Sequence, residues 1–411
     1  MMQEAESAPE KKVLFINRFF YPDHSATSQL LSDLAFDLVR EGYQVEIVTS
    51  RLRYDDSTAR LSKSETVNGV LVHRVWTSRF GRGNLAGRAI DYLTFYVTAA
   101  WTLFDRTDKN TIVVAKTDPP LISVVAAIVT KLRGALLVNW LQDVFPEVAA
   151  ELGVKFMRGP VLALLKRIRN TTLRAAYMNV VLGTRMEQFI REEAGDDINI
   201  RVIPNWADGQ ALKPVPREEN KLRSEWGLDG KFVVGYSGNL GRVHEFDTIL
   251  GAAEILSHRD DIVFLFIGGG AQREVVENEA NRRGLSSIAF RPYQPREQLS
   301  ESLSAADVHL VSLNPKLEGL IVPSKFYGIA AVGRSSIFIG ASDGEIATTV
   351  LTNNCGNSVE IGNYASLANS IVLLSEDSEY KKEQEYYARS IFETLYDRDK
   401  GLQQWVNIIR G

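Results

Sequence analysis

A lysine and a serine stand at the expected start of a helix, in the run GLIVPSKFYGIAAVGR (319–334). Pro323 suits the first helical turn, because the amide hydrogen that proline lacks would be unsatisfied there. Free backbone amides around Ser324, the helix dipole and the full charge of Lys325 would together attract an anion. The pattern predicts a diphosphate site, and the alternative is a helix cap beside a solvated lysine.

A second group of ligand-binding candidates closes an expected strand in the run GYSGNLGR (235–242). Gly238 and Gly241 lack a Cβ atom, so the backbone beside Asn239 could approach a ligand closely. The guanidinium of Arg242 forms a planar fork that matches phosphate oxygens. We therefore expect Arg242 to act as the second cation of the diphosphate site, unless the run is only a glycine-rich turn.

Another glycine-rich turn, FIGGGAQR (266–273), follows the next expected strand. Gly268 and Gly269 would either wall a nucleotide base or simply turn the chain tightly, and both interpretations stay open. The P-loop pattern G-x-x-x-x-G-K-[ST] is missing from the sequence, and the loop after the first expected strand has no glycine. These gaps disfavour P-loop and dinucleotide-dependent enzymes.

The first half of the chain offers a carboxylate in VNWLQDVFPE (138–147), just past an apolar strand pattern. Gln142 and Asp143 could accept hydrogen bonds from sugar hydroxyls there, and Asp143 could act as a base. Asp143 could equally cap the next turn. In YPDHSATS, His24 and Ser25 are further candidates for contact with an acceptor, although a lone histidine in a loop is more often structural.

Short β-branched runs alternate with longer helical patterns in two series, which predicts two α/β domains with parallel sheets. The run PNWADGQALKPVPREEN, with three prolines and no periodicity, separates the two series. We place the first domain at 1–206, the linker at 207–216 and the second domain at 217–389. The expected strands are VLFIN, QVEIVTS, VLVHRVW, TIVVAK, ALLVNWL, NVVLGT and IRVIPN, then FVVGYSG, IVFLFIGGG, IAFRPY, DVHLVSL and SSIFIG.

Composition narrows the function further. The 411 residues carry a net charge of −4, which disfavours a nucleic-acid binder because phosphate neutralisation needs a basic surface. A single cysteine, Cys355, excludes an internal disulfide and fits a reducing compartment. Scattered histidines without ligand spacing lead us to expect no metal site. No apolar signal core follows the polar start, so we expect a cytoplasmic protein.

A basic stretch leads into an aromatic helix pattern over 70–104. Between Val70 and Ile90 there are four arginines and no acidic residue, and apolar residues then recur at helical spacing up to Phe104. The longest uncharged run, 92–104, is too short to span a bilayer. The stretch suits attachment to the surface of an anionic membrane, or a helix packed on the sheet.

Nearly the whole chain resembles the retaining glycosyltransferases of family 4, with the two-domain GT-B fold, and within them bacterial polysaccharide and O-antigen sugar transferases. The order and spacing of several runs carry this likeness: FFYPDHSATSQLLSDLAFDLVREGYQVEIVTS, TDPPL, QDVFPE, VIPN, GYSGNLGR, IGGG, AADVHLVSL and VPSKFYGIAAVGR. The resemblance implies two doubly wound domains facing each other across a cleft. It also implies a final helix, from about 390 to 411, that crosses back to the first domain.

By this resemblance the second domain binds a sugar nucleotide without a metal, and the first binds the acceptor. Arg242 and Lys325 would hold the diphosphate, with Asn239 and Ser324 beside them. Glu318 lies where many members carry a donor-binding glutamate, whereas Gly328 occupies the position of a second glutamate that binds the ribose.

The resulting prediction is a sugar transferase that uses a nucleoside-diphosphate sugar, with UDP as the expected nucleotide, and a glycan or lipid-linked acceptor. Alternatives are a non-catalytic nucleotide-sugar-binding or partner protein, motivated by the missing glutamate, and a sugar-nucleotide epimerase.

Overall fold

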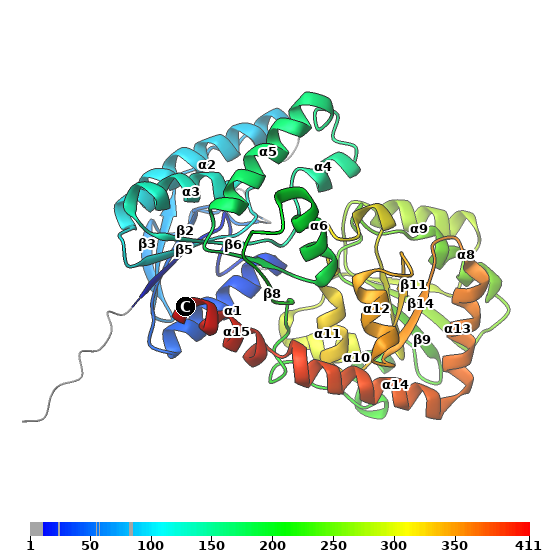
Figure 1. The fold of residues 1–411 in the computed structure, drawn as a ribbon. Helices are drawn as coiled ribbons and strands as arrows, with labels where there is room; N and C mark the ends of the chain where they lie inside the picture. Colours follow the sequence, from blue (N-terminus) through cyan, green and yellow to red (C-terminus); the bar gives the residue numbers. More distant parts are fainter. Residues whose placement is uncertain (1–10, 24, 55, 57, 82–84) are drawn as a thin grey trace, which may run out of the picture. The chain divides into compact units, whose positions relative to one another are not determined.

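The computed structural model describes residues 11–23, 25–54, 56, 58–81 and 85–411. The chain divides into two compact units of similar size. The first unit extends to Pro204 and also includes Leu402–Gly411, and the second unit is Asn205–Gly401. Each unit contains one sheet covered by helices (Figure 1).

The first unit is built on an eight-stranded sheet in the order β3-β4-β2-β1-β5-β6-β7-β8, with only β3 antiparallel to its neighbour in the described residues. Its strands are β1 (Lys12–Ile16), β2 (Gln44–Ser50), β3 (Ser64–Val67), β4 (Val70–Val75), β5 (Thr111–Ala115), β6 (Leu136–Trp140), β7 (Met178–Val181) and β8 (Ile200–Val202). Its helices are α1 (Ala26–Arg40), α2 (Leu85–Arg106), α3 (Ile122–Arg133), α4 (Glu147–Glu151), α5 (Gly159–Ala175) and α6 (Thr184–Ala194).

Helices cover both faces of this sheet, which explains why its central strands are apolar throughout (Figure 1). On one face, Phe95 and Leu103 of α2 pack with Ala126 of α3 against β1 and β5. On the other face lies the end of the chain, where the ring of Trp405 is 4.7 Å from that of Trp140. The predicted return of the final helix to the first domain is therefore confirmed.

The second unit is built on a parallel six-stranded sheet in the order β11-β10-β9-β12-β13-β14. Its strands are β9 (Phe232–Ser237), β10 (Ile262–Ile267), β11 (Ile288–Arg291), β12 (Val308–Ser312), β13 (Ser335–Ile339) and β14 (Gly356–Val359). Its helices are α7 (Lys221–Glu225), α8 (Asp247–Ile255), α9 (Arg273–Arg282), α10 (Leu299–Ser304), α11 (Lys325–Ala331), α12 (Glu345–Thr352), α13 (Tyr364–Glu376) and α14 (Ser378–Ile391), and α15 (Arg398–Arg410) runs on into the first unit.

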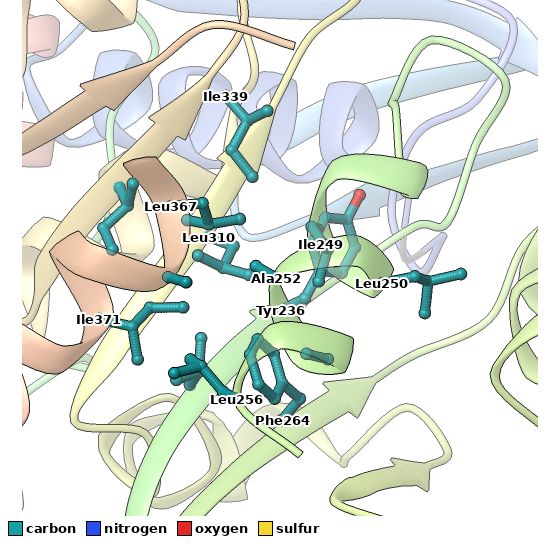
Figure 2. Close-up of a cluster of buried hydrophobic side chains, with 14 of the residues drawn as sticks. Tyr236, Ile249, Leu250, Ala252, Leu256, Phe264, Leu310, Ile339, Leu367 and Ile371 are labelled. Atoms are coloured by element: carbon teal, nitrogen blue, oxygen red, sulfur yellow. The ribbon is translucent and has the colours of Figure 1, made fainter. Parts of the chain in front are cut away.

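The main core of the second unit lies between this sheet and helices α8 and α13 (Figure 2). Ile249 of α8 and Ile371 of α13 are fully buried against Phe264 and Leu310 of the sheet. Tyr236, near the carboxyl end of β9, belongs to the same cluster. The core therefore fixes the end of β9, where the first glycine loop begins.

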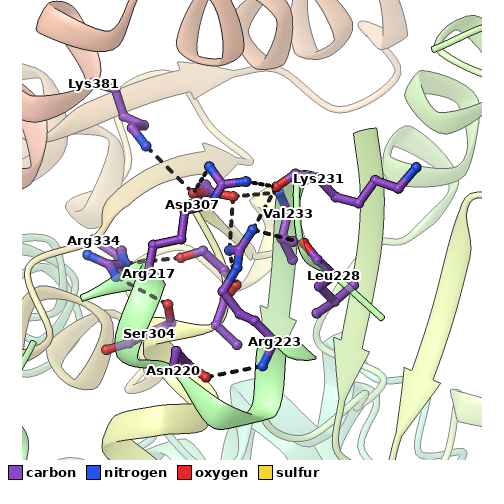
Figure 3. A network of polar contacts seen from close by, with 12 residues as sticks. Arg217, Asn220, Arg223, Leu228, Lys231, Val233, Ser304, Asp307, Arg334 and Lys381 are labelled. Carbon is purple, nitrogen blue, oxygen red and sulfur yellow. Dashed lines mark hydrogen bonds and ion pairs between the residues drawn. The ribbon is translucent and has the colours of Figure 1, made fainter. Parts of the chain in front are cut away.

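A buried carboxylate anchors the start of the second unit to its sheet (Figure 3). Oδ2 of Asp307 accepts hydrogen bonds from the backbone amide of Val233 at 2.8 Å and from Nη1 of Arg223 at 3.2 Å. Arg217 and Lys381 lie 3.4 and 3.6 Å from its other oxygen. This network holds β9 and β12 together, because Asp307 immediately precedes β12.

Three features differ from the sequence-based expectation. The short polar strands β3 and β14 were not predicted, because SETV and GNSV lack an apolar run. The expected linker at 207–216 lies within the second unit, where the amide of Gly209 donates to Oδ1 of Asp397 at 3.1 Å. The returning segment begins at Leu402 rather than near 390.

Candidate functional site

The strand order of the second unit reverses between β9 and β12, since the chain builds outward from β9 to β11 and then resumes on the other side. In doubly wound sheets such a switch point opens a crevice at the carboxyl ends of the strands, where ligands bind. The loop after β9 contains Gly238 to Arg242, and the segment after β12 leads to Lys325. The predicted donor residues therefore gather at this point.

The two glycine-rich turns are joined by backbone hydrogen bonds. The amide of Gly238 donates to Ile267 O at 2.9 Å, and the amide of Leu240 donates to Gly269 O at 2.7 Å. Gln272 completes the connection: its backbone amide donates to Leu240 O at 2.9 Å, and its side chain donates to Gly241 O at 3.1 Å. The loops thus form one preformed surface.

Glycine is required where these loops touch. Gly268 has φ of +138°, and a Cβ there would lie 2.1 Å from the carbonyl oxygen of Gly238. Gly270 has φ of +133°, and a Cβ there would lie 2.2 Å from Oδ1 of Asn239. Side chains at either position would separate the loops, so the glycines serve close backbone packing. Whether they also wall a base stays a prediction.

Lys325 places its ammonium group in this surface. Its Nζ is buried, has no hydrogen-bond partner in the described structure, and sits 3.5 Å from the centroid of the Tyr236 ring. A Cβ on Gly238 would lie 3.9 Å from Lys325 Cε, so the ammonium stem runs beside the first glycine loop. Burial holds the pKa of Lys325 well below its usual value. An ammonium can donate three hydrogen bonds, and here all are available to a ligand.

Aromatic and imidazole rings support this lysine from the sheet side. The hydroxyl of Tyr236 donates to Asn239 O at 3.2 Å, and Nδ1 of His244 lies 2.5 Å from Ser312 O. Burial, assisted by the charge of Lys325, lowers the pKa of His244 to about 3. His244 is therefore neutral near pH 7 and adds no positive charge to the site.

Three predicted donor residues lie exposed around the same loops. Arg242, Asn239 and Ser324 face solvent, and Arg242 forms no ion pair within the described part of the chain. Helix α11 begins at Lys325 and has seven residues, so Pro323 lies before the helix rather than in its first turn. Because α11 is so short, its dipole is small, so the predicted anion site depends mainly on the charge of Lys325.

Glu318 has a structural role that the sequence did not reveal. Its Oε1 accepts a hydrogen bond from the amide of Glu345 at 2.8 Å, at the start of α12. A Cβ on Gly344 would lie 2.6 Å from Oε2. Glu318 therefore caps α12, and its predicted contact with the donor stays a prediction.

Gly328 faces the interior of the second unit. A Cβ there would meet Leu303 at 3.4 Å and Leu212 at 3.9 Å, and Lys325 is not among its neighbours. A side chain at this position would start out towards α10, which is consistent with the absence of a ribose-binding residue at 328.

The first-unit candidates also follow strands. Asp143 lies three residues after β6 and lines a cavity of about 40 Å³ with Lys116 and Asn139. Burial raises the pKa of Asp143, while a hydrogen bond from Thr117 opposes that rise. Gln142 beside it is buried.

The remaining acceptor candidates lie at the start of α1. The Ser25 hydroxyl is buried and has no hydrogen-bond partner in the described structure, so it could contact a ligand. His24 lies outside the described residues.

No three His, Cys, Asp or Glu side chains gather as a metal site in the described ranges, and none of the described helices is long and apolar enough to cross a membrane.

Three supporting residues were not singled out from the sequence. Tyr236 and Gln272 stand inside the glycine-rich runs, where a large aromatic residue just before a glycine turn could have marked a ligand platform. Lys116 follows β5, donates to Thr27 O at 2.7 Å and sits 3.6 Å from the centroid of the Trp140 ring.

Two family models match the two halves of the chain. Residues 27–206 match the glycosyl transferase 4-like domain, and residues 218–391 match the glycosyl transferases of group 1. The chain belongs to the glycosyltransferases of this 4-like, GT-B type. The two matches leave only the ends and a short connecting segment uncovered.

Relatives and solved structures agree with this membership. The protein named as the glycosyltransferase WbjE of Pseudomonas aeruginosa is 29% identical over 60% of this chain and 62% of its own length, so the chain aligns with less than two thirds of it. The protein named as the colanic acid biosynthesis glycosyl transferase WcaI of Escherichia coli is 27% identical over 69% of this chain and 70% of its own length.

Two solved structures share the fold over nearly their full length. Sucrose-phosphate synthase from Thermosynechococcus elongatus has a TM-score of 0.76 at 16% identity, over 97% of this chain and 98% of that one. Anabaena HepE, in complex with UDP and glucose, has a TM-score of 0.74 at 17% identity, over 97% and 99%. The predicted GT-B fold with two Rossmann-like domains is confirmed.

Proposed function

We propose that this glycosyltransferase moves a sugar from a nucleoside-diphosphate sugar, UDP-linked, to a glycan or lipid-linked acceptor in the synthesis of a cell-surface polysaccharide. The observation that carries the proposal is the buried, unpartnered ammonium of Lys325 at the switch point of the second sheet. A buried cation without a partner is costly, and a diphosphate would compensate it. The UDP complex of the related fold in HepE supports the choice of nucleotide.

Lys325 and Arg242 act on the leaving group in this proposal. Cations fixed in advance stabilise the charge that develops on the departing diphosphate oxygen, which lowers the barrier without a metal ion. The anomeric carbon–oxygen bond breaks, and the acceptor oxygen bonds to the same face of that carbon. Because the new bond forms on the face that the leaving group departs from, the configuration is retained, and the acceptor's proton passes to the leaving phosphate oxygen.

Asp143 serves the acceptor side in the same proposal. Its carboxylate accepts a hydrogen bond from a sugar hydroxyl near the reacting centre, and Gln142 and Ser25 assist in placing the acceptor. A carboxylate in this role must be ionised, so its raised pKa sets a lower pH limit on activity.

The test is transfer of sugar from UDP-glucose and other UDP-sugars to a panel of lipid-linked and free glycans, followed by UDP release. We expect UDP release that survives EDTA and a product with the anomeric configuration of the donor, read by NMR. An inverted product would contradict retention, and activity lost on chelation would contradict the metal-free mechanism.

A non-catalytic nucleotide-sugar-binding protein is the second candidate, favoured by the inward-facing Gly328 at the family's ribose position. It predicts UDP binding without any turnover across the panel, including slow donor hydrolysis. Measurable hydrolysis of any bound UDP-sugar eliminates it.

A further inference from the structure

A hollow of about 580 Å³ lies at the carboxyl ends of β2 and β4 in the first unit. Among the described residues, its lining contains three arginines, Arg51, Arg60 and Arg79, two large aromatic residues, Trp76 and Phe80, and no acidic residue. The carboxyl ends of parallel strands are where α/β sheets present ligand sites.

The positive charge of this hollow is not neutralised from within the protein. None of the three arginines forms an ion pair in the described ranges of the chain, and only Nε of Arg51 is committed, to Leu61 O at 3.0 Å. One guanidinium group can donate two parallel hydrogen bonds to two phosphate oxygens. Several guanidinium groups together match the two negative charges of a diphosphate.

The wall of the hollow is held in place by a buried carboxylate. Oδ1 of Asp91 accepts hydrogen bonds from the amide of Phe80 at 3.0 Å and from the hydroxyl of Ser78 at 2.6 Å, and Oδ2 accepts from the amide of Gly81 at 3.1 Å. Asp91 is on α2, so the segment that contains Arg79 is fixed to that helix. A preformed wall reduces the entropy lost on binding.

An exposed apolar strip continues from the hollow along α2. Trp76 and Phe80 are 60% and 65% exposed, and on α2 Val97 and Trp101 are 65% and 81% exposed. The hydroxyl of Thr98, next to Val97, donates to Trp76 O at 2.9 Å, so strip and hollow adjoin. A contiguous apolar patch of this kind marks a binding surface for apolar groups.

We infer that the hollow binds the diphosphate of a lipid-linked acceptor, with the arginines on the phosphates and the hydrocarbon chain along Trp76, Phe80 and the exposed face of α2. This inference rests on the proposed function. A hollow lined by three arginines fits one diphosphate better than the flat array of head groups in an anionic bilayer.

The position of the hollow also restricts the acceptor. In the sheet order, β2 and β6 are three strand steps apart, which corresponds to about 14 Å at the usual spacing. Asp143 follows β6, so a short saccharide must separate the lipid diphosphate from the hydroxyl that reacts. The acceptor is then a lipid-linked glycan rather than a lipid phosphate alone.

Farnesyl diphosphate is a suitable probe, titrated into the full chain with saturating UDP present to occupy the donor site. The double variant Arg60→Gln/Arg79→Gln changes two arginines without a structural hydrogen bond, and Arg201→Gln, an exposed arginine on β8, is the matched control. We expect the double variant to bind the probe at least about tenfold more weakly, and the control to bind it normally.

Three outcomes overturn the inference: unchanged affinity in the double variant, no binding of the probe to the wild type, or equal weakening in the control. Sedimentation with phosphatidylglycerol vesicles tests the alternative that the arginines bind the head-group phosphates of an anionic bilayer. If the double variant loses vesicle binding but keeps farnesyl diphosphate, the surface serves the bilayer and the inference is wrong. Failure of the wild type to bind UDP would instead contradict the proposed function. In that case a titration with farnesyl diphosphate alone still tests whether the hollow binds a lipid diphosphate.

Discussion

Two buried lysines, one in each unit, occupy similar positions but differ in one respect. Lys116 follows β5, and Lys325 lies in the segment after β12, and each ammonium sits over an aromatic ring, Trp140 or Tyr236. Nζ of Lys116 donates to Thr27 O at 2.7 Å, whereas Nζ of Lys325 has no partner in the described structure. Burial lowers the pKa of both lysines.

We propose that this difference separates a structural cation, Lys116, from a ligand-binding one, Lys325. Both sheets reverse their strand order at the corresponding place, between β1 and β5 and between β9 and β12. At the first place the ammonium of Lys116 donates a hydrogen bond to the carbonyl oxygen of Thr27, so its partner comes from the protein itself. At the second place, Nζ of Lys325 has no partner in the described structure, and in the proposed function a bound diphosphate supplies it.

The largest effect on UDP binding is expected from Lys325→Met. A hydrogen bond to a charged group contributes about 1.5–3 kcal/mol, so UDP should bind roughly 10- to 100-fold more weakly in a titration. Lys116→Met is the matched control and should leave UDP affinity unchanged. Equal losses in both variants would show that the two lysines do not differ in function.

The same variant should be more stable than the wild type. Because the pKa of Lys325 is lowered on folding, the unfolded chain binds a proton that the folded chain lacks in the pH range between the two pKa values, and below that range both forms carry the ammonium. The wild type therefore loses stability as pH falls below the usual lysine pKa of about 10.4. The melting temperature of Lys325→Met should exceed that of the wild type by a margin that widens as pH falls below about 10.4 and stops widening at the lowered pKa of folded Lys325. A difference that stays constant with pH would contradict this.

Gly268→Ala should act through the loops rather than through charge. Its Cβ would lie 2.1 Å from Gly238 O, so the loops must separate and both UDP affinity and melting temperature should fall. Gly284→Ala is the control for backbone strain alone, since Gly284 has φ of +70° and nothing within 4 Å of an added Cβ. If both variants weaken UDP binding equally, close loop contact does not matter.

Asp143→Asn tests the acceptor side and should leave UDP affinity intact. Removing a positioned acid–base group typically costs about 100-fold or more in turnover. In the wild type, kcat/KM should fall as pH drops through the raised pKa of Asp143. Thr117→Val removes the hydrogen bond that opposes this rise, so it should shift the pH limb upward. A limb that stays in place in Thr117→Val would exclude Asp143 as its source.

Arg242→Gln should have the smallest effect. The side chain is exposed, and exposed charge pairs contribute only about 0.2–1 kcal/mol. UDP should bind roughly two- to fivefold more weakly at low salt, and the difference should disappear at high salt because of screening. A large loss that persists in salt would place Arg242 in a buried contact.

Much of this architecture was predictable because β-branched runs such as IVFLFI and TIVVA leave little choice but a buried strand. The glycine loops were also recognisable from GYSGNLGR and IGGG. The sequence could not reveal the hydrogen-bond partners of the polar side chains, because these partners come from elements that are distant in the chain. Thr27 is far from Lys116 in sequence, and Glu318 caps a helix that begins at Glu345.

The start of the α11 helix shows the same limit. Pro323 and Ser324 have the composition of a helix start, yet the helix begins at Lys325 and ends after seven residues. Lys325 does lie at a helix start, as expected, whereas the anion affinity of that start stays a prediction. Tyr236 was missed because the sequence does not show that the side chain of Lys325 lies over the ring of this strand residue.

A crystal structure of the protein with bound UDP tests the central claim most directly. We predict that Lys325 Nζ lies within hydrogen-bond distance of a diphosphate oxygen, with the phosphates against Gly238 and the adjoining loop. A diphosphate bound elsewhere, with Lys325 still unpartnered over Tyr236, would contradict the assignment of the donor site.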